Sequence, residues 1–205
     1  MLNYTEINPP KKAFIFELDN VLYPEKDYLL QVYYLFANFL EYTETYPQAA
    51  ELVVFFKKAY ENAGPALIFE KAKEAFGIDE KYRENFLRLH LQAQLPLKLL
   101  LFKEALDLLQ ELVVDRKDVY IVTSGNPAQQ MNKIRQIEWN GLEKYLRVYF
   151  ADEVKPKPAP DVLTLITEEH GLKPEDCVIL GVGTEDEAFA RNAKIDFINV
   201  RNTLY

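Results

Sequence analysis

Apolar residues along the chain follow two different patterns, and these predict two kinds of structure. Residues 13–18, "AFIFEL", form a short apolar run that is typical of a buried strand. From residue 24 to residue 95 the apolar side chains recur at helical spacing, as Leu29, Val32 and Phe36 illustrate. This second region predicts about four helices with no strand between them.

Beyond residue 97, predicted strands and helices alternate. The predicted strands are "DVYIVTSG", "LRVYFADE", "DCVILGVG" and "DFINV", and the predicted helices are "LFKEALDLLQELV", "PAQQMNKIRQI", "PDVLTLITEEHG" and "TEDEAFARNA". Asn126 and Pro127 suit the N-cap and first position of the second of these helices. Alternation of this kind predicts an α/β fold with a mostly parallel sheet covered by helices on both faces.

Composition narrows the classes of function. The chain has 205 residues, a formal net charge of −8 and a single cysteine, Cys177. An acidic chain without a long basic block disfavours binding to nucleic acid or to an anionic membrane. One cysteine excludes an intrachain disulfide, and with two histidines it is too little for a zinc cluster. Residues 1–12 contain no apolar signal core, so we expect a cytoplasmic protein.

Polar residues gather where the predicted strands end. Glu17 and Asp19 follow the first strand, Thr123-Ser124-Gly125 end the second, and "DEVKPKPAPD" and "GVGTEDE" follow two later strands. Each motif alone has an ordinary structural explanation, such as a strand-to-helix turn or acids in a first helical turn. Ligands of parallel sheets bind at the carboxyl ends of the strands, so together these groups suit a phosphate and a divalent cation.

The order of these motifs resembles that of the haloacid dehalogenase superfamily, whose members are mostly magnesium-dependent phosphatases with an aspartate nucleophile. "FELDNVLY", "YIVTSGN", "KPKPAPD" and "VILGVGTEDEAFARNAKI" carry the resemblance, which covers residues 13–23 and about 100–200. It implies a Rossmann-like three-layer core, formed by residues 1–23 and 97–205. It also implies an all-helical cap domain, inserted as residues 24–96.

The resemblance implies roles for individual residues. By position, Glu17 stands for the nucleophile and Asp19 for the general acid/base. The phosphate of a small phosphorylated metabolite would contact Thr123 and the turn at Ser124 and Gly125. Lys157 would neutralise charge between nucleophile and phosphate, with Lys155 as the alternative. Mg²⁺ would be held by Glu17, Asp19 and Asp186, with Glu185 as the alternative to the last of these.

Two positions depart from the pattern of the family. Glu17 replaces the aspartate nucleophile, and Val182 replaces the first aspartate of the metal motif. We therefore expect weak magnesium binding and a hydrolase with impaired catalytic motifs; the alternative is a non-catalytic ligand-binding or regulatory protein. The longer Glu17 side chain is expected to approach Lys157 or the Thr123 hydroxyl. The oligomeric state is left open.

Three further residues are given structural interpretations. His90 is expected on a helix surface, His170 beside a helix C-terminus, and Cys177 in the apolar core.

Overall fold

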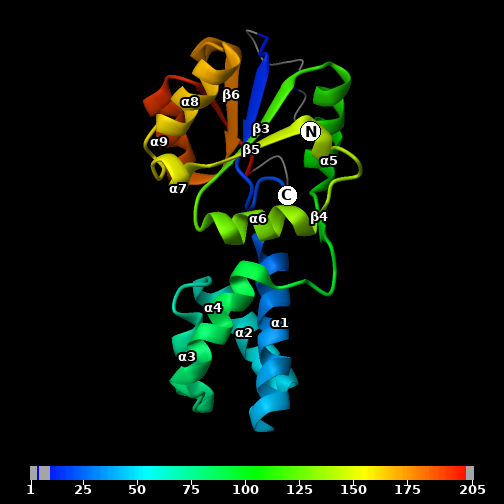
Figure 1. Ribbon diagram of the computed structural model, residues 1–205, viewed down its shortest axis with the longest axis vertical. Helices are drawn as coiled ribbons and strands as arrows, with labels where there is room; N and C mark the ends of the chain where they lie inside the picture. Colours follow the sequence, from blue (N-terminus) through cyan, green and yellow to red (C-terminus); the bar gives the residue numbers. More distant parts are fainter. Residues whose placement is uncertain (1–3, 5–9, 202–205) are drawn as a thin grey trace. The chain divides into compact units, whose positions relative to one another are not determined.

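The computed structural model describes residue 4 and residues 10–201 (Figure 1). The chain forms two compact units. The first, here called the core unit, comprises Met1–Pro24, Leu100–Met131 and Ile137–Tyr205, and the second, here called the helical unit, comprises Glu25–Leu99 and Asn132–Gln136. The expectation for residues 1–12 lies largely outside the described residues. That the helical unit acts as a cap domain stays a prediction.

A five-stranded parallel sheet forms the centre of the core unit. Its strands are β1 (Ala13–Phe16), β3 (Asp118–Thr123), β5 (Leu146–Phe150), β6 (Cys177–Gly181) and β7 (Asp196–Asn199). Their order in the sheet is β5-β3-β1-β6-β7. The predicted α/β fold with a parallel sheet is confirmed. Two short strands that the sequence did not indicate, β2 (Leu99–Leu100) and β4 (Ile137–Glu138), pair separately.

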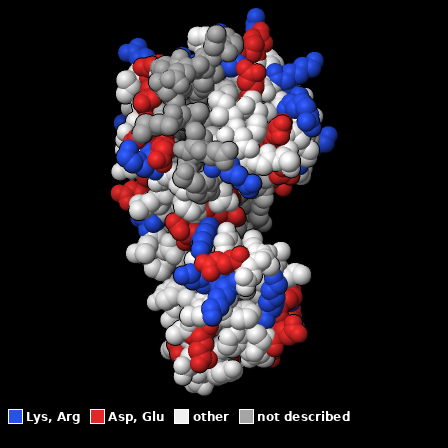
Figure 2. Space-filling view, turned by 180° about the vertical axis from the view of Figure 1, so that it is seen from behind, with Lys and Arg blue, Asp and Glu red and all other residues white. Residues whose placement is uncertain are grey.

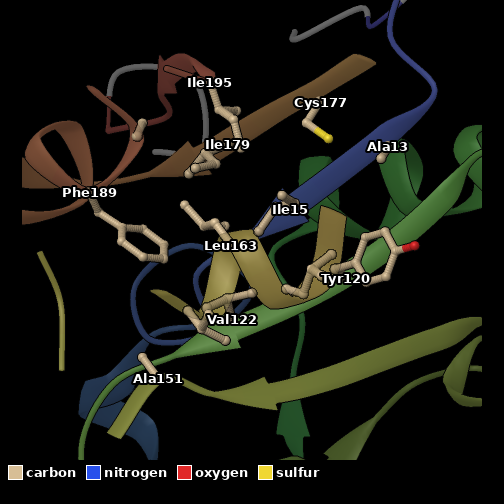
Figure 3. Packing of buried hydrophobic residues seen from close by; sticks show 13 residues of the cluster. Ala13, Ile15, Tyr120, Val122, Ala151, Leu163, Cys177, Ile179, Phe189 and Ile195 are labelled. Atoms are coloured by element: carbon tan, nitrogen blue, oxygen red, sulfur yellow. The ribbon is translucent and has the colours of Figure 1, made fainter. Parts of the chain in front are cut away.

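Helices cover both faces of this sheet (Figure 1). They are α5 (Lys103–Val114), α7 (Ala151–Val154), α8 (Asp161–His170) and α9 (Gly183–Ala193), whereas α6 (Pro127–Gln136) runs from the core unit into residues of the helical unit. Because side chains alternate along a strand, Ile15, Tyr120 and Ile179 share one face. On that face they pack against Leu163 of α8 and Phe189 of α9 (Figure 3). The position of Cys177 in this cluster agrees with its interpretation as a core residue.

The helical unit has an aromatic core of its own. Its helices are α1 (Glu25–Glu44), α2 (Ala49–Ala63), α3 (Ile68–Phe76) and α4 (Arg83–Gln92). Tyr33 of α1 stacks against Phe56 of α2, with ring centroids 4.9 Å apart. Phe36 of α1 packs edge to face against Phe86 of α4, with ring centroids 5.0 Å apart. Burial of these large rings in one cluster stabilises this unit.

Two expectations at residue level were wrong. His90 does not lie on an open helix surface, because its ring packs 4.8 Å from that of Phe86 and 5.9 Å from that of Tyr33. The strand predicted as "LRVYFADE" ends at Phe150, and Ala151–Val154 form α7. By contrast, His170 does lie in the last turn of α8, which Gly171 terminates in the left-handed conformation.

Acidic and basic side chains are interspersed on the face that Figure 2 shows, apart from the grey residues. Over the described part of the chain, no helix is both long enough and apolar enough to cross a membrane.

Candidate functional site

The carboxyl ends of three central strands bring the predicted site residues of the core unit together. β1 pairs with β3 on one side and with β6 on the other, so that Phe16 lies opposite both Ile121 and Leu180. Glu17 directly follows β1, Thr123 ends β3, and Val182 follows β6. From β1 the chain adds β3 and β5 on one side of the sheet, and it later adds β6 and β7 on the other side. The point beside β1 where the strand order switches is where open α/β sheets form their ligand-binding crevice.

Lys157 is the central charge of this site. Its Nζ forms an ion pair with Glu17 Oε2 and a second, at 2.9 Å, with Asp186 Oδ1. Only 2% of the Lys157 side chain is exposed. Burial alone would lower the pKa of Lys157, but the two carboxylates outweigh it, so that its pKa is raised overall. The ammonium is therefore held in its charged form by internal partners.

Glu17 is turned inward by the same contacts. Burial raises the pKa of Glu17, and the charge of Lys157 opposes this rise. The second carboxylate oxygen, Oε1, accepts a hydrogen bond of 2.8 Å from the backbone N–H of Leu18. The Thr123 hydroxyl also contributes a hydrogen bond to Glu17. Both groups that Glu17 was expected to approach thus lie beside it.

Asp186 is fixed by the start of α9. Its Oδ2 accepts a hydrogen bond of 2.9 Å from the backbone N–H of Val182, while Oδ1 faces Lys157. A carboxylate in this first turn also interacts favourably with the positive end of the helix dipole. The side chain packs so closely over Gly181 that a Cβ there would lie 2.7 Å from Asp186 atoms. Glycine at the end of β6 is therefore required to admit this carboxylate.

Gln130 of α6 connects Asp19, Thr123 and Ser124 by hydrogen bonds. Its Nε2 donates to Asp19 Oδ2 and to Thr123 Oγ1, both at 3.0 Å, and to the backbone carbonyl of Ser124. Asp19 Oδ1 accepts a further hydrogen bond, at 2.7 Å, from the Tyr23 hydroxyl. The predicted general acid/base and the predicted phosphate-binding hydroxyl are thus joined through one amide.

The remaining predicted residues lie in different environments. Ser124 Oγ is buried and has no partner among the described residues, and the same holds for Gln130 Oε1. The Gly125 N–H donates to Asp152 Oδ2 at 2.8 Å. The two alternatives left open by the sequence lie at the surface: Glu185 is exposed, and Lys155 pairs with Asp161 at 3.8 Å.

The carboxylates of this arrangement do not fit a magnesium ion. Magnesium needs oxygen ligands in near-octahedral geometry, but both oxygens of Glu17 and both of Asp186 already accept hydrogen bonds or an ion pair within the protein. Val182 offers no ligand where an acid was expected. Within the described part of the chain, no group of three or more His, Cys, Asp or Glu side chains could hold a metal ion.

Sequence reasoning missed Gln130 and Asp152. Gln130 stands one turn after the Asn126 cap, whose Oδ1 accepts the N–H of Ala128 at 2.9 Å. That cap fixes where the helix begins and therefore which side chains share a face, but Gln129 and Gln130 are equivalent in the sequence. Asp152 was placed both at the end of a predicted strand and in the strand-end segment "DEVKPKPAPD", but nothing in that pattern indicated its contact with the Gly125 amide.

Comparison with known proteins identifies the family. The sequence matches the model of the family described as haloacid dehalogenase-like hydrolase over residues 14–200. Comparison with curated proteins finds no match.

Solved structures share the fold. A haloacid dehalogenase-family hydrolase from Bacillus subtilis, bound to magnesium, is 18% identical, with 91% of this chain and 87% of that chain covered and a TM-score of 0.59. A protein from Thermotoga maritima described as a beta-phosphoglucomutase is 22% identical, with 90% of this chain and 82% of that chain covered and a TM-score of 0.59. A family hydrolase from Deinococcus radiodurans with bound phosphate and sodium is 16% identical over 93% and 80%, with a TM-score of 0.56.

Proposed function

The chain belongs to the haloacid dehalogenase-like hydrolase family, and from this premise we propose that it is a phosphomonoesterase-type protein with an impaired catalytic site. The observation that carries the proposal is the ion pair between Lys157 and Glu17. The cation that would receive a substrate phosphate is instead bound by the residue in the nucleophile's position. A small phosphorylated metabolite remains the proposed ligand.

Each residue has a defined task in this proposal. Lys157 and the Thr123 hydroxyl would contact phosphoryl oxygens. The turn at Ser124 and Gly125 would add backbone N–H groups, and that of Gly125 would first have to exchange Asp152 Oδ2 for the ligand. Asp19 would hold the proton that the leaving group needs, because it stands beside the same pocket. The family's metal would add positive charge against the phosphate, but no residue here is assigned to it.

Two physical effects oppose turnover. In-line attack requires the nucleophilic oxygen about 3–3.5 Å from phosphorus, and an error of about 1 Å can cost on the order of 100-fold in rate. The additional methylene of Glu17 would displace that oxygen, and the ion pair with Lys157 would hold it there. A phosphate must therefore compete with an internal carboxylate before any reaction begins.

A second function, binding without turnover, is favoured by the internal network of the site. Thr123 and Lys157 bond to Glu17, and Lys157 also pairs with Asp186, without a ligand. Gln130 Oε1 and Ser124 Oγ, which are buried and have no partner among the described residues, are left to a ligand. Buried polar groups that are mutually satisfied keep a site ordered. Such a site would respond to a ligand by exchanging partners, which suits a regulatory protein.

An aryl phosphatase assay tests the lead proposal. We expect wild-type kcat/KM close to background, because the Glu17 oxygen is misplaced for attack and the charge of Lys157 is taken up by Glu17 rather than by the phosphate. Glu17→Asp and Val182→Asp should each raise it only modestly. The double variant should exceed the product of the two single effects, and only there should added magnesium increase the rate, because nucleophile and metal act as one unit. Glu187→Asp, at an exposed position, is the matched control for the loss of a methylene.

Two outcomes would decide against impaired catalysis. High wild-type activity that falls on Glu17→Asp would identify Glu17 as an adapted nucleophile. Saturable binding of inorganic phosphate to the wild type in calorimetry, with no turnover in the wild type or the double variant, would favour the binding protein.

A further inference from the structure

A pocket lies at the end of the core sheet opposite to the candidate active site. It has a volume of about 300 Å³ and is lined by Val113, Arg116, Lys117, Asp118, Lys144, Tyr145, Leu146 and Arg147. These residues come from two segments: the turn between α5 and β3, and the segment from the 3₁₀ helix Glu143–Tyr145 into β5. The segments meet because β3 and β5 are parallel neighbours, with Val119 opposite Leu146. The volume is at the lower end for small-molecule sites.

Basic side chains dominate this pocket. Of its eight lining residues four are basic and one is acidic, although the whole chain carries a net charge of −8. The one acid, Asp118, is neutralised by Arg147 at 2.8 Å. Among the described residues, no ion pair involves the other three cations, which are Arg116, Lys117 and Lys144. Three cations therefore line one cavity, and none of them has an ion-pair partner in the part of the chain that the structure describes.

The acids of the candidate active site do not compensate this charge. Asp118 begins β3 and Thr123 ends it, so the pocket and the site are separated by the length of the strand, about 17 Å at roughly 3.3 Å per residue. Exposed charges are screened over about 8 Å at physiological ionic strength. The charges of the active site are therefore screened from this pocket, and its ligand need not be the ligand of the active site.

We propose that this pocket binds a small phosphorylated polyanion, carrying at least two phosphate groups, at a site separate from the proposed active site. Phosphate groups match the chemistry of the cations, because guanidinium binds phosphate in a bidentate manner and ammonium binds it as a point charge. Arg116 follows the end of α5 in the left-handed conformation, with φ of 55°, and Lys117 and Lys144 supply the ammonium groups.

The lining also favours an organic part on the ligand. The Tyr145 side chain is 49% exposed, and Lys144 Nζ lies 5.0 Å from its ring centroid. Val113 and Leu146 provide apolar surface in the same cavity. A ring or short carbon chain could therefore rest against Tyr145 while its phosphates contact the cations. A single phosphate would leave most of the positive charge unmatched, which is why two or more are proposed.

Calorimetric titration with inorganic pyrophosphate, at about physiological ionic strength, tests the charge requirement without presupposing the organic part. Arg116→Glu combined with Lys144→Glu should weaken binding at least tenfold. The matched control is Lys57→Glu combined with Lys58→Glu, exposed positions of α2 in the helical unit. Both pairs change the net charge equally, and the control should change affinity by less than about twofold, because distant exposed charges are screened.

Amide chemical shifts identify where the probe binds. Pyrophosphate should move the signals of residues 113–118 and 144–147, and inorganic phosphate should bind at least tenfold more weakly. The proposal fails if binding does not saturate, if both charge-reversed pairs lose affinity equally, or if phosphate binds as well as pyrophosphate. It also fails if the shifts are confined to residues 123–125 and 157, which would assign the probe to the active site. If the double variant does not fold, Lys144→Gln replaces it, with Lys58→Gln as its control.

Discussion

Lys157 shows how one residue can stabilise the fold while limiting the chemistry of the site. A buried ammonium is unfavourable unless charged partners compensate its desolvation. Glu17, which follows β1, and Asp186, in the first turn of α9, supply that compensation. The same contacts remove the free positive charge that a phosphate would need, so stability and phosphate affinity oppose each other at this residue.

Removing this cation should destabilise the protein strongly. Lys157→Met leaves two buried carboxylates facing each other, and we expect a loss of about 3 kcal/mol in the free energy of unfolding. Lys155→Met is the matched control. Lys155 is exposed, and its distance of 3.8 Å to Asp161 makes a weak surface ion pair, so the loss of stability should stay within about 0.5 kcal/mol. Urea denaturation of both variants measures the difference.

The pH dependence of the Lys157→Met loss checks its cause. Without Lys157, the pKa of Glu17 should rise further, because burial and Asp186 both raise it and the lysine opposes them. A raised carboxyl pKa contributes stability below the unfolded value and loses it as the pH rises through the folded value. The variant should therefore lose less stability relative to wild type at acidic pH. A pH-independent loss would indicate a packing effect instead.

At this scale the sequence was informative where a residue belongs to a motif and uninformative where it does not. The position of Glu17 beside Lys157 and Thr123 could be expected, because its longer side chain carries the carboxylate toward the residues that the other motifs place around it. Gln130 could not, since a glutamine in a polar helix carries no signal of the three oxygens it will contact. The assignment of Asp186 or Glu185 also required the structure, which fixes the start of α9 at Gly183.

At the scale of elements, the ends of helices were predictable when a capping residue marked them. Asn126 precedes α6, and Gly77 and Gly171 terminate α3 and α8 in the left-handed conformation. The end of β5 was not predictable, because the residues after Phe150 carry no turn signal and α7 is only four residues long. Two-residue strands such as β2 and β4 depend on pairing, which a local pattern does not contain.

Helix packing around His90 gives a prediction for the stability of α4. Burial among aromatic rings, assisted by the nearby charge of Lys133, lowers the pKa of His90 to about 4. The unfolded chain therefore binds more protons than the folded protein between about pH 4 and 6.5. Stability from this residue is present above that range and lost as the pH falls through it, by about 2 kcal/mol after allowance for its residual exposure.

The comparison of wild type with His90→Leu measures this contribution. Carboxyl groups elsewhere in the chain also change their protonation at acidic pH. The quantity of interest is therefore the difference in unfolding free energy between the two proteins from pH 4 to 7.5. Leucine keeps an apolar contact with Phe86 but cannot be protonated. The difference should shift in favour of the variant as the pH falls. A constant difference would mean that His90 is protonated equally in both states.

At the scale of the whole molecule, the chain has two separate hydrophobic cores. In the core unit, strands and helices pack around residues such as Ile179, which is 2% exposed, and in the helical unit aromatic rings pack around Phe56, which is fully buried. A unit with its own core can fold as a domain. The alternation of strands and helices predicted the first core, and the helical periodicity of residues 24–95 predicted the second. Residues 132–136 of the helical unit could not be assigned from the pattern, since they continue a helix that begins in the other unit.

Two core truncations test whether these units are independent domains. Ile179→Ala and Phe56→Ala should each cost about 3 kcal/mol, because each leaves a cavity in a packed core. The only tryptophan, Trp139, belongs to the core unit and is 7% exposed, so its fluorescence reports that unit, whereas far-UV circular dichroism reports the helices of both. If the units are domains, Phe56→Ala should lower the urea midpoint of part of the dichroism signal and leave the fluorescence midpoint in place. Ile179→Ala should lower the fluorescence midpoint.

Equal shifts of both signals in both variants would show one cooperative unit and contradict the division into two domains.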